Sequence, residues 1–280
     1  MIIDGHSHAC GRFLTAESII KTLDSNGVDK VILTSGELNS KAEYSLPNIA
    51  ALFPHRNVVK LSNYLTKFMM KLSGKVKDIP MGNEHVYDLT QKTKDRVIQF
   101  IWITSQINKP SDYLDKKRTV CDFKGVKLHQ CWEKSSVDSD FFREVACWAE
   151  KNDLPLFIHL SNDSEVAKLI EYKKNHPELK LIVAHLFGLA VFIKKNLKDK
   201  NLYFDTSPFQ LISKKRLIDA IRFAGADKIL FGTDTPYSGK DNIRQSINRI
   251  KNLEISNCDK ELILGGNIQK LLKLQDSNAS

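Results

Sequence analysis

Two histidines stand two residues apart near the start of the chain, in the segment MIIDGHSHACGRF. His6 and His8 follow a short apolar run, so we expect them at the end of a β-strand, where residues two apart share one face. Two neutral imidazoles on one face are ligands that a borderline cation such as Zn²⁺ accepts. A single buried histidine has a hydrogen-bonded structural role at least as often, so this pair needs partners elsewhere in the chain.

Residues of the same chemical kind end or follow later apolar runs. They are Lys127 and His129 in GVKLH, His159 in LPLFIH, His185 in IVAH, Asp205 in LYFD and Asp234 in LFGTDTP. In GVKLH the apolar Val126 and Leu128 share one face, which leaves Lys127 on the other. Burying an unpaired charge against helices is strongly disfavoured, so we expect these polar side chains to point into a shared site.

The elements that position these residues follow from the apolar pattern. Eight runs are expected as strands: Met1–Gly5, Lys30–Thr34, Val97–Thr104, Gly125–His129, Leu154–His159, Leu179–His185, Leu202–Asp205 and Lys228–Thr233. Helices are expected at Thr15–Ser25, Asn83–Lys94, Asp112–Val120, Ser139–Asn152, Ser164–Asn175, Leu186–Lys198, Ser213–Ala224 and Asp241–Asn252. This alternation over 280 residues predicts an α/β fold, a closed (β/α)8 or TIM barrel. An open doubly wound sheet alternates too, but polar residues at six strand ends match the catalytic face of a barrel.

One segment interrupts the regular repeat. Residues 36–81 separate the second strand from its helix, which is too long for an ordinary connection between a strand and a helix. The segment contains an apolar-periodic helix in NVVKLSNYLTKFMMKLSGK. We expect a helical insertion at the barrel mouth. It could serve only to pack against the barrel, act as a lid, or form a contact with a second copy of the chain. No composition shift divides the chain, so residues 1–280 are expected to form a single domain.

Composition narrows the class of partner. The net charge of +9 comes mostly from lysines spread along expected helices, without an arginine-rich tract, so we expect no nucleic-acid partner. No apolar run approaches the roughly 20 residues that span a bilayer, so we expect no membrane partner. Five scattered cysteines without a CxxC pair favour reduced thiols and a cytoplasmic location. The expected partner is a small-molecule substrate, with a homodimer as a weaker expectation.

Together these residues predict a site for one divalent ion. The expected ligands are His6, His8, His159 and Asp234. His185 is then placed to orient a water molecule or to stabilise developing negative charge. Zn²⁺ is expected first, although the same ligands accept Mn²⁺ or Fe²⁺.

The motifs DGHSH, FKGVKLH, LPLFIH, IVAH and LFGTDTP, in this order, resemble the amidohydrolase superfamily. The closing ILGGNIQKLLKL is similar to the end of its amidohydrolase-related branch, which contains small-molecule hydrolases and metal-dependent non-oxidative decarboxylases. The resemblance implies a barrel with metal at its mouth and the four ligands given above. Some members carboxylate a lysine on the fourth strand. That would make Lys127 a bridge between two metals and His185 a second-site ligand, but a GVKLH-like strand commonly accompanies one metal.

The expected reaction is hydrolysis of an amide, ester or lactone-like bond in a small anionic substrate by a metal-activated water. Asp234 is expected as base and then acid, with His185 or Lys127 stabilising the oxyanion. Residues expected to contact the substrate are Arg12, His129 and Asp205; Arg12 is a carboxylate clamp or, alternatively, a surface residue. One alternative is non-oxidative decarboxylation at the same site, and another is a barrel that binds a ligand without catalysis.

Overall fold

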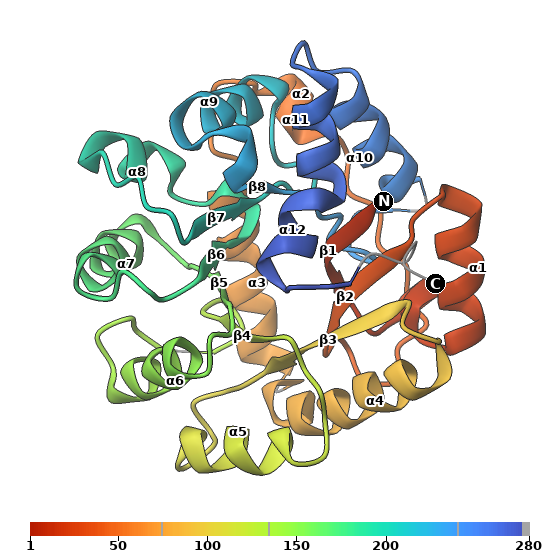
Figure 1. The fold of residues 1–280 in the computed structure, drawn as a ribbon, viewed down its shortest axis with the longest axis vertical. Helices are drawn as coiled ribbons and strands as arrows, with labels where there is room; N and C mark the ends of the chain where they lie inside the picture. Colours follow the sequence, from red (N-terminus) through yellow and green to blue (C-terminus); the bar gives the residue numbers. More distant parts are fainter. Residues whose placement is uncertain (74, 134, 240, 276–280) are drawn as a thin grey trace.

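Eight parallel strands form one sheet in chain order in the computed structural model, which describes residues 1–73, 75–133, 135–239 and 241–275 (Figure 1). The strands are β1 Ile3–His8, β2 Lys30–Thr34, β3 Val97–Trp102, β4 Gly125–His129, β5 Leu156–His159, β6 Leu181–Val183, β7 Leu202–Asp205 and β8 Ile229–Leu230. The eight-strand alternation that the sequence predicts is confirmed. Five strands differ at their ends: β1 runs on through both histidines, and β3, β5, β6 and β8 are shorter than expected.

The sheet closes because β1 bonds to the backbone that follows β8. The Gly5 amide donates to the Phe231 carbonyl at 2.9 Å, and the His8 amide donates to the Thr235 carbonyl at 2.8 Å. Ser7 and Thr235 also form an isolated parallel bridge. The architecture is therefore a (β/α)8 barrel, and its closure lies directly beside the first histidine pair.

Helices, several of which begin at a polar capping residue, surround the barrel. They are α1 Ala16–Asn26, α4 Ile79–Lys92, α5 Pro110–Arg118, α6 Asp140–Lys151, α7 Asp163–Asn175, α8 Leu189–Lys195, α9 Lys214–Ala224, α10 Asn242–Lys251, α11 Asn257–Glu261 and α12 Asn267–Leu271. Thr15, Ser139 and Ser213 each accept a hydrogen bond from a backbone N–H of the first turn, which is why α1, α6 and α9 begin there. Their apolar faces pack on the outer side of the strands.

The barrel interior is apolar at one end. Ile3, Phe100 and Phe157 pack there with Ile268 of α12, so this end is filled rather than open. Figure 1 shows α12 in front of the barrel. The polar strand ends lie at the other end, as the sequence predicts.

The insertion after β2 has helical structure. It contains α2 Ile49–Leu52, α3 Val59–Ser73 and a short 3-10 helix Lys75–Asp78, which leads directly into α4. The helix expected within this segment is α3, and in Figure 1 it lies behind the strands, away from α12. Within the described residues, no helix combines the length and apolar character needed to cross a bilayer. The five cysteines are free thiols, as expected.

Asp4 secures the closure from inside the barrel. Its fully buried carboxylate accepts hydrogen bonds from the Thr233 amide at 3.0 Å and the Thr233 hydroxyl at 2.6 Å. It also accepts from the Ser7 hydroxyl at 2.9 Å and the His6 amide at 3.2 Å. One side chain therefore joins β1 to the segment after β8.

We expect Asp4→Ala to lower the free energy of unfolding by about 2–4 kcal/mol, because two buried N–H groups and two hydroxyls lose their acceptor. Asp4→Asn keeps an oxygen for both N–H groups and is expected to lose less than about 1.5 kcal/mol. Urea unfolding followed by circular dichroism measures both. Equal stability of Asp4→Ala and the parent protein would contradict this role.

Candidate active site

A cavity of about 220 Å³ opens where the strands end at the barrel mouth. Six residues that the sequence singles out line it: His6, His8, His129, His159, His185 and Asp234. The insertion supplies further lining residues, including Asn63 of α3 and Glu37 and Tyr44 of the loop after β2. The insertion that interrupts the repeat thus covers the site.

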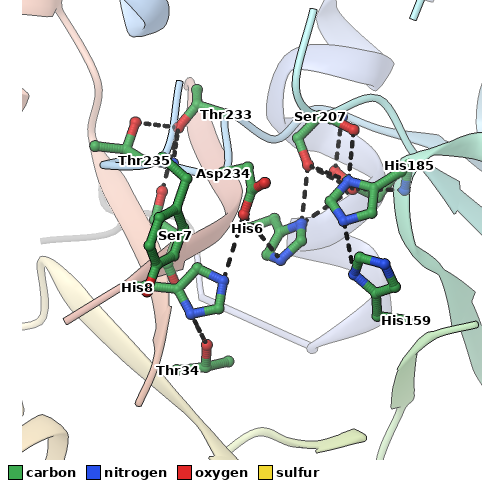
Figure 2. Close-up of polar contacts among 12 residues, drawn as sticks. His6, Ser7, His8, Thr34, His159, His185, Ser207, Thr233, Asp234 and Thr235 are labelled. Atoms are coloured by element: carbon green, nitrogen blue, oxygen red, sulfur yellow. Dashed lines mark hydrogen bonds and ion pairs between the residues drawn. The ribbon is translucent and has the colours of Figure 1, made fainter. Parts of the chain in front are cut away.

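His6 and His8 present one nitrogen each to Asp234 (Figure 2). His6 Nδ1 donates to Asp205 Oδ2 at 3.1 Å, and His8 Nδ1 donates to the Ser35 carbonyl at 2.8 Å. These bonds leave Nε2 of each ring as the nitrogen that faces Asp234. His6 Nε2 lies 3.7 Å from Asp234 Oδ1, and His8 Nε2 lies 3.4 Å from it.

These three donors fit a divalent cation. One donor atom each from His6, His8 and Asp234 lie within 4.8 Å of one another. Burial lowers the pKa of His6 well below its ordinary value, so the ring is neutral, as a metal ligand has to be. Three protein ligands with positions left for substrate are typical of catalytic metal sites. The bond from His6 to Asp205 is the carboxylate–histidine arrangement that commonly orients such a ligand.

His159 and His185 face each other beside this group. Asn63 Nδ2 donates to the Leu160 carbonyl at 2.9 Å, so Asn63 Oδ1 accepts from His159 Nε2 at 2.7 Å. His185 Nδ1 donates to the Ser207 carbonyl at 2.7 Å. The remaining nitrogens, His159 Nδ1 and His185 Nε2, lie 3.0 Å apart. Two lone pairs repel at this distance, so a proton or another cation has to lie between them.

The predicted fourth ligand is therefore not in the same group. His159 bonds to Asn63 and His185, and neither nitrogen joins the cluster of His6, His8 and Asp234. Burial lowers the pKa of His159 well below its ordinary value. The pair therefore shares one proton between His185 Nε2 and His159 Nδ1.

His129 lines the cavity without a free nitrogen lone pair at Nδ1. Its ring lies on His159, with centroids 3.9 Å apart, and on Trp102, with centroids 5.3 Å apart. Its Nδ1 accepts from the Cys131 amide at 3.2 Å. His129, Cys131 and His159 also lie close enough to hold an ion. Both nitrogens of His159 have hydrogen-bond partners, and burial raises the pKa of the Cys131 thiol to about 12, which makes this group a poor fit.

Three other predicted residues lie outside the described cavity lining. Asp205 is 1% exposed and accepts from the His185 amide at 3.1 Å and the Ser207 hydroxyl at 2.6 Å. It thereby fixes the backbone of His185, and it also accepts from the His6 ring, so its geometry does not support the predicted contact with substrate. Arg12 donates to Glu43 through Nε at 3.1 Å and Nη2 at 2.7 Å, so its position does not support a carboxylate clamp.

Lys127 lies beneath His6, fully buried. Its Nζ is 3.0 Å from His6 Nε2 and 3.8 Å from the centre of the Phe157 ring. Burial lowers the pKa of Lys127 to about 7. A cation bound at His6 Nε2 would compete with this hydrogen bond. Lys127 is thus a neighbour of the candidate ligand group rather than a part of the described cavity wall.

Sequence reasoning missed Asn63 and Ser207. Asn63 lies in the insertion, and its bond to His159 joins residues 96 positions apart. Ser207 follows β7 and bonds to both His6 and His185. Ser207 lies two residues past Asp205, so strand parity is the one signal that could have found it.

Comparisons with known proteins agree with the barrel architecture. A family model described as amidohydrolase matches residues 71–274. Among curated proteins, the gamma-resorcylate decarboxylase of Polaromonas sp. (strain JS666 / ATCC BAA-500) is 30% identical over 119 residues. That match covers 35% of this chain and only 36% of the relative's length.

Solved structures share the fold over nearly the whole chain. A 2,6-dihydroxybenzoate decarboxylase from Rhizobium superimposes with a TM-score of 0.70 at 18% identity, covering 98% of each chain. A probable 2-pyrone-4,6-dicarboxylic acid hydrolase from Acinetobacter baumannii gives 0.68 at 12% identity, covering 97% of this chain and 99% of the other. A dihydroxybenzoic acid decarboxylase from Polaromonas sp. JS666, with bound manganese and the inhibitor 2-nitroresorcinol, gives 0.67 at 16%, covering 99% and 98%.

The ligand group predicts an order of metal affinities. We expect His8→Ala and Asp234→Ala to weaken Mn²⁺ binding by more than ~100-fold, and Asp205→Asn by ~10–100-fold through loss of the bond that orients His6. His159→Gln is expected to weaken it by less than ~10-fold, because His159 lies outside the group. Isothermal titration calorimetry measures these changes, with thermal unfolding as the control for folding. Equal losses in His159→Gln and His8→Ala would place His159 among the ligands.

The variant Lys127→Met distinguishes a one-metal site from a two-metal site. With a single ion, we expect one Mn²⁺ per chain to remain and its affinity to hold or rise, because a neighbouring cation is removed. With a carboxylated Lys127 bridging two ions, the variant would lose metal. Metal content of the dialysed protein, measured by mass spectrometry, decides between them.

Proposed function

Because the chain belongs to the amidohydrolase family, we propose that it is a metal-dependent enzyme that removes the carboxylate of a small aromatic acid as carbon dioxide. The observation that carries the proposal is the convergence of His6 Nε2, His8 Nε2 and Asp234 Oδ1 at the wall of the cavity. A divalent ion there would give a carboxylate substrate its counter-charge.

The cavity wall suits a single aromatic ring. Tyr237 meets His8 edge-on with centroids 5.1 Å apart, and Tyr44 lies beside Tyr237 at 5.4 Å. Trp132 also lines the cavity. The volume of about 220 Å³ is below the roughly 300 Å³ at which drug-sized pockets begin, which favours a molecule of one ring.

The choice of decarboxylation over hydrolysis rests on similarity. The sequence first predicts hydrolysis, with decarboxylation as its alternative. The partial match to a gamma-resorcylate decarboxylase supports the alternative better. The likeness to a probable hydrolase shows only the shared fold, so hydrolysis of a lactone remains the second candidate.

The proposed reaction exchanges the carboxylate for a proton. A divalent ion held by His6, His8 and Asp234 supplies a Lewis acid that neutralises the substrate's carboxylate. His185 holds a proton on Nε2 against His159 Nδ1 and lines the cavity. This proton moves to the ring carbon that bears the carboxylate. The carbon–carbon bond then breaks, its electron pair stays on the ring, and carbon dioxide leaves.

The surrounding residues fix this geometry. Asp205 and Ser207 hold His6 and His185 in their tautomers. The insertion helix α3 fixes His159 through Asn63 and helps to keep water from the ring. Lys127 Nζ lies 3.0 Å from His6 Nε2, the nitrogen that would hold the ion, so metal binding would replace this hydrogen bond.

We expect Mn²⁺-loaded protein to release carbon dioxide from at least one member of a panel of hydroxylated benzoates, and His185→Gln to lower kcat by ~10²–10⁴-fold, because the proton donor is lost. Carbon dioxide is measured by a coupled assay and the ring product by chromatography. The control is His55→Gln, a histidine of the insertion outside the described cavity lining, which is expected to leave kcat unchanged. Ring opening of 2-pyrone-4,6-dicarboxylate without carbon dioxide release would instead support hydrolysis.

A further inference from the structure

A carboxylate from the insertion lines the same cavity as the histidines. Glu37 belongs to the loop after β2, and its side chain is 12% exposed. Among the contacts described, none of the candidate metal ligands forms a hydrogen bond with Glu37. Any role for it concerns the part of the substrate that the metal group does not hold, so the inference rests on the proposed function.

Two neighbours fix the orientation of this carboxylate. The Tyr44 hydroxyl donates to Glu37 Oε1 at 2.6 Å, and Lys75 Nζ donates to Oε2 at 2.5 Å. Each carboxylate oxygen accepts more than one hydrogen bond, so acceptor capacity remains for a group inside the cavity. Holding the carboxylate in place beforehand lowers the entropy cost of using it.

An aromatic wall connects Glu37 to the metal group. Along this wall His8 contacts Tyr237, Tyr237 contacts Tyr44, and Tyr44 bonds to Glu37. A one-ring acid whose carboxylate lies at His8 therefore presents another ring position toward Glu37. The two ends of this wall could therefore contact different parts of one molecule.

Charge decides what that other part can be. Among the residues described as lining the cavity, the acidic side chains are Glu37 and Asp234, the pair of His159 and His185 shares one proton, and neither lysine nor arginine is present. A second carboxylate on the ring would meet Glu37 and lose solvation without a counter-charge. A hydroxyl or amino group would instead donate to Glu37, and a charged acceptor makes a strong hydrogen bond.

We propose that Glu37 is a specificity-determining residue, which selects aromatic monocarboxylates with a hydroxyl or amino donor on the ring and excludes aromatic dicarboxylates. A site built to hydrogen-bond a substrate group discriminates strongly against the analogue without it, because a buried polar group is then left unpaired. Glu37 thereby separates hydroxybenzoate-like from dicarboxylate-like substrates.

The test compares four probes on Mn²⁺-loaded protein: benzoate, 3-hydroxybenzoate, 4-hydroxybenzoate and terephthalate. We expect at least one hydroxybenzoate to bind at least ~10-fold more tightly than benzoate, and terephthalate to bind more weakly than benzoate. In Glu37→Gln the hydroxyl advantage is expected to fall below ~3-fold, and terephthalate to gain ~10-fold, because the carboxylate is removed while its shape is kept. Titration calorimetry gives the dissociation constants.

Lys75→Met is the matched control. It removes the cation behind Glu37 but leaves the carboxylate, so the preference for the hydroxybenzoate is expected to persist. Survival of the preference in Glu37→Gln, or its loss in Lys75→Met, would overturn the proposal. Thermal unfolding of both variants, with Glu37→Ala as a second replacement, separates loss of recognition from loss of the fold.

Benzoate itself separates this proposal from the proposed function. If benzoate binds Mn²⁺-loaded protein equally in the parent and Glu37→Gln while the hydroxyl advantage also persists, Glu37 does not set specificity although the metal site stands. If none of the three monocarboxylates (benzoate, 3-hydroxybenzoate and 4-hydroxybenzoate) binds the metal-loaded parent, the proposed function itself fails.

Discussion

The backbone hydrogen bonds between β1 and the residues after β8 set the positions of the candidate metal ligands. The His6 carbonyl accepts from the Asp234 amide at 2.8 Å, so the contact that closes the barrel also joins two candidate ligands. Asp234 has a positive φ of 57°, a strained conformation that this bond helps to hold. Gly232 lies in the same stretch, where a Cβ would meet Asp205 Oδ1 at 2.3 Å. The contacts that close the barrel therefore also bring the candidate ligands together.

Hydrogen bonds around the rings decide which nitrogens can do chemistry. Backbone carbonyls and Asp205 take the Nδ1 protons of His6, His8 and His185, which turns all three Nε2 atoms toward the cavity side. In His159 the arrangement is the opposite: Nε2 bonds to Asn63 of the insertion, and Nδ1 faces His185. Two nitrogens thus face a cation site and two others share a proton, which gives a carboxylate both a counter-charge and a proton donor.

Strand parity and spacing predicted the barrel and six of the cavity residues, because both depend on local periodicity. This pattern could not predict the contacts of Arg12 or Asp205. Their side-chain partners, Glu43 and Ser207, lie in loops, whose conformation the periodicity does not determine. His185 adopts a left-handed conformation, with a φ of 60°, after β6 ends at Val183. No residue type in the segment IVAH predicts this turn. The bond between Asn63 and His159 spans the insertion and a strand, so it follows only from the assembled structure.

The central claim is that one divalent ion binds between His6, His8 and Asp234. Its most direct test is a crystal structure of Mn²⁺-soaked protein with anomalous data collected at the manganese edge. The account predicts one anomalous peak within bonding distance of His6 Nε2, His8 Nε2 and an oxygen of Asp234. A peak between His129, Cys131 and His159, or no peak at the first group at saturating Mn²⁺, would contradict it.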